Sequence, residues 1–416
     1  MPEKHNAERR EQYTKAVEQL GNVSVPVRLG GVYTLVSLVD EWLREENIEY
    51  NERVAEGQVI INILCAYIRS PFALASHYDE LIQDAPTAEG LYKNREQEFY
   101  IDKAGLESEK KVRLSIIKEI RSRLQGSKEN TPGVWSDFEY DFSGSIFFYP
   151  VDFTHSYYAK PVNFSGSAYW GEADFRGSTY WGSAGFARST YRGGAYFNGS
   201  TYLSEAVFRG SVYRCAATFN DSVYRYWVDL RGSTYQGAAD FGGSIYRYWA
   251  DFRGSTYRRW AYFNDSICCG WAGLSHSVYE GEADFSGSIF CSDIYFGQDG
   301  DNSSFSRFTD CTPQFYDETN HQNALFGSHK NNFTVENGRG HPIYLTPEGL
   351  PLNCAFLAPD QGEYLKSILR RLEEISDEIL AVKNDEEKKG LIEKRQPLDK
   401  EFNEWREKVT TAQRTR

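Results

Sequence analysis

Arginine and tryptophan recur at a spacing of 22 residues in the middle of this 416-residue chain. Guanidinium groups bind carboxylates, and indole rings stack on planar or apolar groups. If residues at this spacing share one surface, the columns predict a face that recognises an acidic protein segment or a glycan. The columns are Arg209, Arg231 and Arg253; Arg225 and Arg247; and Trp227, Trp249 and Trp271.

Stacked like charges repel one another, so the arginine columns need bound anions or neighbouring acids. Asp229 and Asp251 stand one residue before Leu230 and Phe252, on the side of the chain that carries these arginines. Their carboxylates are expected to neutralise the guanidinium groups. The alternative to a recognition face is therefore a solvated surface whose charges cancel locally.

Two cysteines, Cys269 and Cys291, have the same 22-residue spacing. On neighbouring strands this spacing would bring their Cα atoms within disulfide range. The chain has seven cysteines, an odd and scattered set, which is more typical of free thiols in a reducing cytoplasm. The sequence has no CxxC pair and no His/Cys cluster at zinc spacing, which predicts neither a metal site nor a cofactor.

The sequence predicts no catalytic residues and no enzyme activity. Its seven histidines are dispersed, and His155 and His276 take the place of a repeated glycine. Serine recurs throughout the repeat, and small size explains it better than nucleophilicity, because no Ser/His/Asp motif accompanies it. The repeat also contains no loop insertion on which a cleft could be built.

The elements that must position these residues follow a strict eleven-residue period. From Phe142 to Phe296, fifteen positions spaced by eleven hold thirteen Phe and two Leu, without an insertion. Serine follows three residues later in fourteen copies, and an aromatic residue, mostly Tyr, follows five residues later. The predicted core residues are Phe175, Phe186, Phe197, Phe208, Phe219, Phe241, Phe252 and Phe263.

This period favours stacked short strands over a helix. Glycine and serine recur in nearly every copy, and glycine costs about 1 kcal/mol at each helical position. Two copies are expected to close one four-sided turn, and turns then stack at the strand spacing of about 4.8 Å. An inward column of Tyr needs partners for its hydroxyls, which either the Ser column supplies or water supplies near the corners.

Residues 173–177 read Ala-Asp-Phe-Arg-Gly, and residues 250–254 repeat the same five residues. They match the motif small-(Asp/Asn)-(Leu/Phe)-x-x, so the repeat resembles the pentapeptide-repeat family in its variant with an eleven-residue pair. The resemblance implies a right-handed quadrilateral β-helix. The expected fold class is therefore mainly β, a solenoid flanked by helical regions.

Some pentapeptide-repeat proteins resemble B-DNA in shape and charge and bind DNA gyrase, so the resemblance offers a gyrase-binding DNA mimic as an alternative function. Such a mimic needs a strongly acidic surface. Residues 141–300 hold 15 acidic and 12 basic residues, whereas the whole chain has a net charge of −13. The repeat is only weakly acidic, which argues against this alternative.

Apolar residues recur at helical spacing on both sides of the repeat. The predicted domains are an α-helical domain and N-terminal cap at 1–130, the solenoid at 140–297, an irregular C-terminal cap and linker at 298–360, and a charged helical segment at 361–416. The helical domain looks like the region before the repeats in many bacterial pentapeptide-repeat proteins. It is expected to cover the open end of the solenoid, or else to form a HEAT-like groove for a partner.

Apolar residues in the segment 361–416 follow a heptad-like spacing. They are Leu365, Ile368, Leu372, Ile375, Ile379 and Val382. A break is expected near Lys388–Gly390, followed by a second helix. Two arrangements remain open, an intramolecular helical hairpin and a coiled-coil homodimer.

The predicted function is a non-catalytic scaffold for protein interaction, whose protein partner the sequence does not identify. The net charge of −13 argues against nucleic acid as the partner, because phosphates would be repelled. The sequence has no unbroken run of about 18 apolar residues and no secretory signal, so no membrane span is expected. The predicted location is the cytoplasm, and peripheral association with a membrane stays open.

Overall fold

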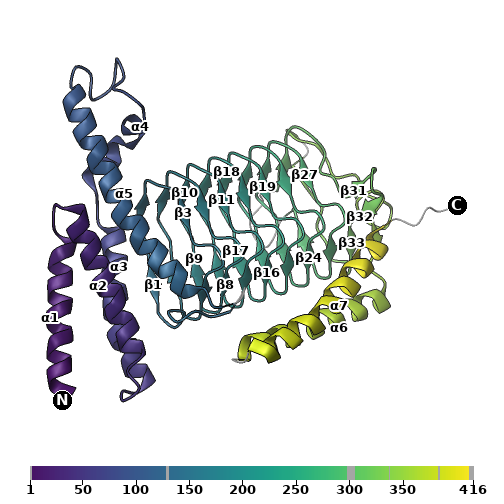
Figure 1. Ribbon diagram of the computed structural model, residues 1–416. Coiled ribbons are helices and arrows are strands. Elements are labelled where there is room, and N and C mark those ends of the chain that lie inside the picture. The colour runs from purple at the N-terminus through teal and green to yellow at the C-terminus, as the bar shows by residue number, and fades with distance from the viewer. Residues whose placement is uncertain (1, 128–130, 298–304, 337, 383–384, 412–416) are drawn as a thin grey trace. The chain divides into compact units, whose positions relative to one another are not determined.

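The computed structural model describes residues 2–127, 131–297, 305–336, 338–382 and 385–411 (Figure 1). The start of the predicted C-terminal cap, residues 298–304, lies outside the described residues. The architecture is mainly β, a parallel β-solenoid with helical regions before and after the repeat. This is the fold class that the eleven-residue period predicts.

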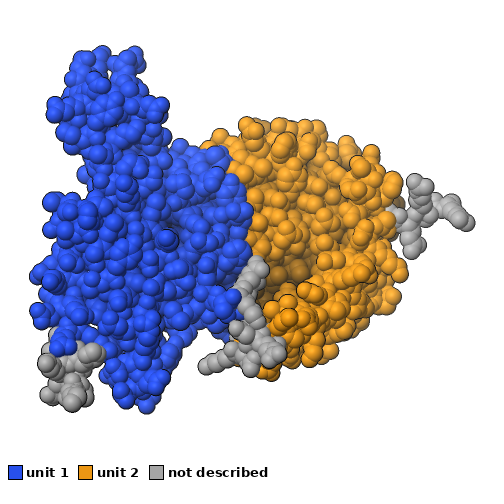
Figure 2. All heavy atoms as spheres, viewed as in Figure 1, with its two compact units in different colours: residues 1–197, 211–215 blue, residues 198–210, 216–416 orange. Residues whose placement is uncertain are grey.

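The chain divides into two compact units (Figure 2). Unit 1 comprises residues 1–197 and 211–215, and unit 2 comprises residues 198–210 and 216–416. Each unit combines helices with several turns of the repeat, and each is described by itself.

The N-terminal part of unit 1 is helical, as its apolar spacing predicts. The helices are α1 (Pro2–Leu20), α2 (Val25–Leu43), α3 (Tyr50–Arg69), the short 3-10 helix η1 (Ala73–His77), α4 (Tyr78–Leu81) and α5 (Glu96–Leu124). Val32, Leu64 and Ile116, from three different helices, are fully buried. Each helix thus turns one apolar face towards the others, as amphipathic helices do.

Four parallel sheets carry the repeat strands of unit 1. They consist of β1 (Tyr140–Asp141), β5 (Val162–Asn163) and β9 (Ala184–Gly185); β2 (Ile146–Phe147), β6 (Ala168–Tyr169), β10 (Thr190–Tyr191) and β14 (Val212–Tyr213); β3 (Val151–Asp152), β7 (Ala173–Asp174) and β11 (Ala195–Tyr196); and β4 (Tyr157–Tyr158) and β8 (Thr179–Tyr180).

The repeat strands of unit 2 are likewise carried by four parallel sheets. They consist of β13 (Ala206–Val207), β17 (Val228–Asp229), β21 (Ala250–Asp251), β25 (Ala272–Gly273) and β29 (Ile294–Tyr295); β12 (Thr201–Tyr202), β16 (Val223–Tyr224), β20 (Ile245–Tyr246), β24 (Ile267–Cys268), β28 (Ile289–Phe290), β33 (Leu325–Phe326) and β34 (Ala355–Phe356); β15 (Ala217–Thr218), β19 (Ala239–Asp240), β23 (Ala261–Tyr262) and β27 (Ala283–Asp284); and β18 (Thr234–Tyr235), β22 (Thr256–Tyr257), β26 (Val278–Tyr279) and β30 (Arg307–Phe308). Strands β31 (Tyr316–Asp317) and β32 (Gln322–Asn323) form a separate antiparallel pair.

Neighbouring repeat strands pair in parallel with a register of 22 residues. In unit 2, Val228 pairs with Ala250, and Ala250 pairs with Ala272. In unit 1, Val162 pairs with Ala184 in the same way. Two eleven-residue copies therefore make one turn, as predicted, and the repeat forms about seven turns.

The predicted phenylalanine core is confirmed, because every predicted core position is at most 5% exposed. Phe175 and Phe197 stack one turn apart, with ring centroids separated by 5.1 Å and an interplanar angle of 2°. Phe186 meets both rings edge-on, with its centroid 5.1 Å from each. Offset stacking and edge-to-face contact are the two arrangements in which aromatic rings attract, so each turn is bound to the next through its interior.

The serine column bonds to the backbone of the turn before it. The Ser255 hydroxyl donates to the Leu230 carbonyl at 3.1 Å and accepts from the Ser233 N–H at 3.3 Å. Corresponding bonds recur along the column. Ser145 belongs to the first copy of the repeat, so no earlier copy offers it a backbone partner, and its buried hydroxyl has no hydrogen bond to any described residue.

The inward tyrosines bury their hydroxyls. Tyr169, Tyr191 and Tyr257 are fully buried, and within the described part of the chain their hydroxyls lack a hydrogen-bond partner. Burial raises the pKa of Tyr169 and Tyr191 well above the ordinary value of 10.0, although a nearby serine hydroxyl lowers it in part. The expectation that serine or surface water would satisfy these hydroxyls is wrong, because the serines are committed to the backbone and the rings lie inside.

Helix α3 covers the first strand of the repeat in unit 1. The Gln58 side chain donates to the Glu139 carbonyl at 2.8 Å and accepts from the Glu139 N–H at 2.9 Å. This side chain takes the place of the neighbouring strand that the backbone just before β1 lacks. Gly57 approaches Phe138 so closely that an added Cβ would lie 2.7 Å from the ring. These contacts support the capping role expected of the helical domain.

Helix α3 also belongs to a segment, Tyr50–Leu81, that by length and composition is apolar enough to cross a membrane. Its most apolar stretch has a mean hydropathy of 1.6, and 33% of that stretch is buried inside the protein. The sequence predicted no membrane span because it contains no unbroken apolar run of sufficient length. Mean hydropathy is a weaker criterion, because an apolar stretch can pass it although it contains polar residues such as Asn62. A core helix has the same composition, and α3 packs against α2, α5 and β1.

Strand stacking continues beyond residue 297, where the sequence period ends. Val278 in β26 pairs with Arg307 in β30, and Ile289 in β28 pairs with Leu325 in β33. The described residues after 304 therefore include longer, irregular turns of the same stack.

Helices α6 (Pro359–Ala381) and α7 (Asp385–Thr410) pack against each other and against the outer face of β24 and β28. Leu365 and Ile368 are almost fully buried in one cluster with Ile267 and Ile289. The heptad stripe is thus covered within the chain by the solenoid face.

The two helices divide at a different place from the one predicted. Helix α6 ends at Ala381 and α7 begins at Asp385, so the expected break near Lys388–Gly390 is wrong. Pro397 also lies inside α7, although proline lacks the N–H that a helix interior uses.

Candidate recognition groove

The three predicted tryptophans of unit 2 stand in line along one sheet. Trp227, Trp249 and Trp271 directly precede β17, β21 and β25, which pair in register. Trp249 is 56% exposed. A Cβ added to Gly273 would lie 2.2 Å from the Trp271 ring, so the glycine leaves room for this indole to lie over the sheet.

The arginines Arg209, Arg231 and Arg253 form a ladder with the aspartates of the same sheet. Arg231 makes two hydrogen bonds of 2.9 Å to Asp229, and Arg253 binds Asp251 at 2.9 and 2.7 Å. Longer ion pairs of 3.5 Å join Arg209 to Asp229 and Arg231 to Asp251. The aspartates therefore pair with the arginines as the sequence predicts, and the hydrogen bonds to Asp229 raise the pKa of Arg231.

The three tryptophans and the ladder residues Arg231, Arg253, Asp229 and Asp251 enclose a groove of about 590 Å³, and Arg209 lies beside it through its contact with Asp229. The Asp229 carboxylate forms part of its floor and is only 2% exposed. At one rim Arg253 stacks over the Trp271 ring, with its guanidinium carbon 4.9 Å from the ring centroid. The groove can thus offer indole faces for stacking and guanidinium edges for charged hydrogen bonds.

The charge of this surface is not fully balanced. Three arginines of the ladder face two aspartates, which leaves a surplus of one positive charge. Among the described residues Arg209 makes a single ion pair, the 3.5 Å contact with Asp229, whose carboxylate already binds Arg231 more closely. The Arg209 side chain is 49% exposed. This guanidinium is the one best placed to bind an external carboxylate.

Two exposed tyrosines extend the aromatic surface and were missed by the sequence reasoning. Tyr226 and Tyr248 stack with centroids 5.7 Å apart, and Tyr248 also contacts Trp249 at 5.6 Å. They are 46% and 49% exposed. Their spacing is the same 22 residues, so the periodicity used for the tryptophans would have found them.

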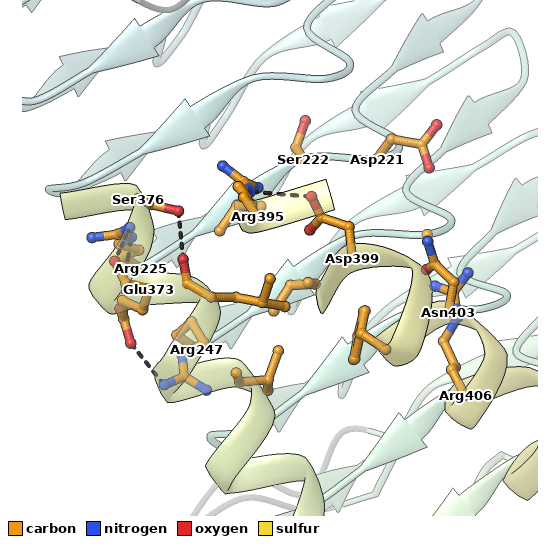
Figure 3. A pocket seen from close by; sticks show the side chains of 16 residues that line it. Asp221, Ser222, Arg225, Arg247, Glu373, Ser376, Arg395, Asp399, Asn403 and Arg406 are labelled. Carbon is orange, nitrogen blue, oxygen red and sulfur yellow. Dashed lines mark hydrogen bonds and ion pairs between the residues drawn. The ribbon is translucent and has the colours of Figure 1, made fainter. Parts of the chain in front are cut away.

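Arg225 and Arg247, which the sequence placed with the recognition face, lie elsewhere. They follow β16 and β20, and helix α6 covers them. Arg247 binds Glu373 at 2.9 Å, and Arg225 contacts Asp377 and Glu373. Figure 3 shows both arginines beside Glu373. Their side chains are only 14% and 23% exposed, so they hold α6 in place and are not part of an open face.

A second cavity, of about 330 Å³, lies between these arginines and helices α6 and α7 (Figure 3). Arg395 and Asp399 of α7 line it and pair at 3.2 Å. Arg406 donates from α7 to the Asp265 carbonyl at 3.0 Å. Arg225, Arg247 and Arg406 thus join the hairpin to the solenoid, whereas the Arg395–Asp399 pair lies within α7.

His155 and His276, the histidines inside the repeat, occupy the left-handed backbone position that glycine holds in most other copies. They adopt φ values of 53° and 62°, and Gly232 has the same conformation at the equivalent position with φ 62°. The described residues contain no group of three or more His, Cys, Asp or Glu placed to hold a metal ion. The groove is therefore the strongest candidate site on chemical grounds.

No protein-family model matches this chain, and comparison with curated proteins and with solved structures gave no match. The description of the repeat thus rests on its own period and geometry.

Proposed function

We propose that this protein is a non-catalytic interaction scaffold of the pentapeptide-repeat kind. The support is the 22-residue register, the stacked phenylalanine interior and the small residues beside it. They fit a four-sided turn in which two five-residue motifs of the family alternate with two units that are one residue longer. Repeat solenoids use extended surfaces for binding, and such surfaces need no loops of their own.

We propose that the groove binds an acidic segment of a protein partner. The observation that carries this proposal is the exposed indole of Trp249 in the groove together with the half-exposed Arg209 guanidinium, which contacts the groove residue Asp229 at 3.5 Å. Aromatic and arginine side chains are the residues that dominate protein interfaces, and a carboxylate would complete the unbalanced ladder. A neutral glycan would use the indoles and leave this charge unmatched.

The packing of α6 and α7 against each other and against β24 and β28 supports an intramolecular hairpin for residues 361–416. A coiled-coil homodimer would need the stripe that includes Leu365 and Ile368, which the solenoid face covers. We also propose a cytoplasmic location, which agrees with seven cysteines that are all free thiols.

Calorimetric titration of the full chain tests the groove. The probes are synthetic peptides in which Glu alternates with Leu and Phe, the same peptides with Gln for Glu, and neutral oligosaccharides. We expect the Glu peptides to bind with an affinity that falls as salt is added, because exposed ion pairs are screened.

Variants locate the binding. Arg209→Ser should weaken the Glu peptide by up to about fivefold, as expected for one exposed ion pair. Trp249→Ala should weaken it by about tenfold or more, as for a buried aromatic anchor. Arg258→Ser is the matched control, because Arg258 is 55% exposed and its ion pair is with Glu280, which does not line the groove, whereas Arg209 contacts the groove residue Asp229.

Two results would overturn the groove proposal. Binding of oligosaccharides alone, independent of salt, would assign the groove to glycans. Equal effects of Arg209→Ser and Arg258→Ser would show that the peptides bind by general charge.

A further inference from the structure

Two cysteines of unit 2 lie side by side on neighbouring turns. Cys269 follows β24 and Cys291 follows β28, and these strands pair in register, Cys268 opposite Phe290. The Cys291 N–H donates to the Cys268 carbonyl at 2.9 Å, which extends the pairing to the two thiols. Adjacent strands lie about 4.8 Å apart, within the Cα range that a disulfide bridges.

The surroundings of the pair are asymmetric. Arg247 places a guanidinium nitrogen 3.9 Å from the Cys269 sulfur. A hydrogen bond from Cys291, together with Arg247, lowers the pKa of Cys269, whereas the same bond and burial raise the pKa of Cys291. By contrast, the pKa of Cys65 and of Cys354 is raised to about 12, chiefly by burial. Cys269 is thus the thiol suited to react as a thiolate, and Cys291 holds the shared proton.

The pair also lies at a structural junction. Both cysteines are partly buried and pack against the cluster in which Leu365 and Leu369 of α6 meet the solenoid. Arg247, which faces Cys269, binds Glu373 of the same helix at 2.9 Å. A change at the thiols therefore occurs directly beneath α6.

We propose that Cys269 and Cys291 form a reversible disulfide when the protein meets hydrogen peroxide. The Cys269 thiolate attacks one peroxide oxygen, so an S–O bond forms as the O–O bond breaks, and the released hydroxide takes up a proton to become water. The Cys291 sulfur then attacks the Cys269 sulfur. The S–S bond forms, the S–O bond breaks, and the leaving hydroxide takes the Cys291 proton. Two thiols are oxidised and one peroxide becomes two waters.

The strand geometry makes this disulfide easy to reduce. Disulfides favour Cβ atoms about 3.5–4.5 Å apart, whereas neighbouring strands hold equivalent atoms about 4.8 Å apart. The bond must pull the two turns together, and strained disulfides have potentials that favour reduction. With this spacing we expect Cys269 and Cys291 to be free thiols in a reducing compartment and to form the disulfide only while an oxidant is present.

Peptide mapping of the full chain tests the proposal. The protein is treated with stoichiometric hydrogen peroxide, its remaining thiols are alkylated, and it is digested without reductant. We expect a cross-linked peptide that joins Cys269 to Cys291 and disappears on treatment with dithiothreitol. Fragment ions from cleavage between Cys268 and Cys269 show which of these two residues carries the cross-link. Cys215→Ser removes an exposed thiol and should leave the cross-link unchanged.

Single variants test the order of the steps. Cys291→Ser should stop the reaction at a sulfenic acid on Cys269, which dimedone traps. Cys269→Ser should leave Cys291 reduced under the same treatment. The proposal is overturned if both thiols stay alkylatable while Cys215 is oxidised, or if Cys291 is oxidised equally fast in the Cys269→Ser variant. Circular dichroism of each variant confirms that the strands remain folded.

The proposal does not depend on the groove. A failure of peptide binding leaves the cross-link intact, and a failure of the cross-link leaves the groove intact.

Discussion

Ser255→Ala should destabilise the solenoid although alanine is slightly smaller than serine. The Ser255 hydroxyl donates to the Leu230 carbonyl at 3.1 Å and accepts from the Ser233 N–H at 3.3 Å. Ser255 is fully buried, so water cannot replace these bonds. The substitution leaves one backbone carbonyl and one backbone N–H unpaired in the interior.

The magnitude follows from these two groups. Each buried polar group left without a partner costs roughly 1–3 kcal/mol, so we expect a loss of about 3 kcal/mol after partial relaxation. Ser145 provides the matched control, because it occupies the same motif position, is fully buried and, in the part of the chain that the structure describes, has no hydrogen bond from its hydroxyl. Ser145→Ala removes an unsatisfied group and should be neutral, or stabilising by about 1 kcal/mol at most.

Urea unfolding followed by circular dichroism compares the two variants with the unaltered chain. Because repeat proteins can unfold in parts, the slope of each transition is compared before the midpoints are converted to free energies. Amide exchange of the Ser233 N–H gives a local readout, and it should accelerate in Ser255→Ala. Equal destabilisation by both substitutions would refute the reasoning and would mean that serine is required for its size alone.

Three further predictions concern the buried tyrosines, the docking of α6 and the mass of the protein in solution. The buried tyrosines have a raised pKa when folded, so their contribution to stability is complete below the ordinary value of 10.0 and is lost as pH rises through it, because unfolding then releases protons. Urea midpoints should fall steeply across this pH, and a flat profile would contradict the burial of the hydroxyls. Leu365→Asp should detach α6, because a charge cannot stay in the cluster with Ile289, and limited proteolysis should then cleave α6 faster than in the Lys366→Asp control, whose side chain is 74% exposed. Light scattering of the unaltered protein should give the mass of a single chain. A mass of two chains would support the coiled-coil homodimer instead of the hairpin.

The repeat and its interior could be predicted from the sequence. A side chain that must fill the same interior position in every turn leaves a strict period, and the positions from Phe142 to Phe296 show it. The 22-residue register then placed Trp227 beside Trp249 and Arg231 beside Arg253. The pairing of Asp229 with Arg231 could also be predicted from the sequence, because the two residues are only two positions apart.

The roles of the serine and tyrosine hydroxyls could not be predicted in the same way. The period showed that serine is small and that tyrosine recurs, but not which hydroxyl faces the backbone. The structure shows that the serine column is a ladder of backbone hydrogen bonds, and that among the described residues the hydroxyls of Tyr169, Tyr191 and Tyr257 are buried without such bonds.

The amino-acid sequence by itself determined the solenoid. Each turn contacts the next through residues 22 positions apart, and the same contacts recur in every turn. Only the tertiary structure decided which outer columns stay open. Arg225 and Arg231 are equally periodic, yet α6 covers the first and leaves the second beside the groove. That difference arises because α6 lies more than a hundred residues further along the chain and docks where Ile267 and Ile289 present an apolar face, which no local period records.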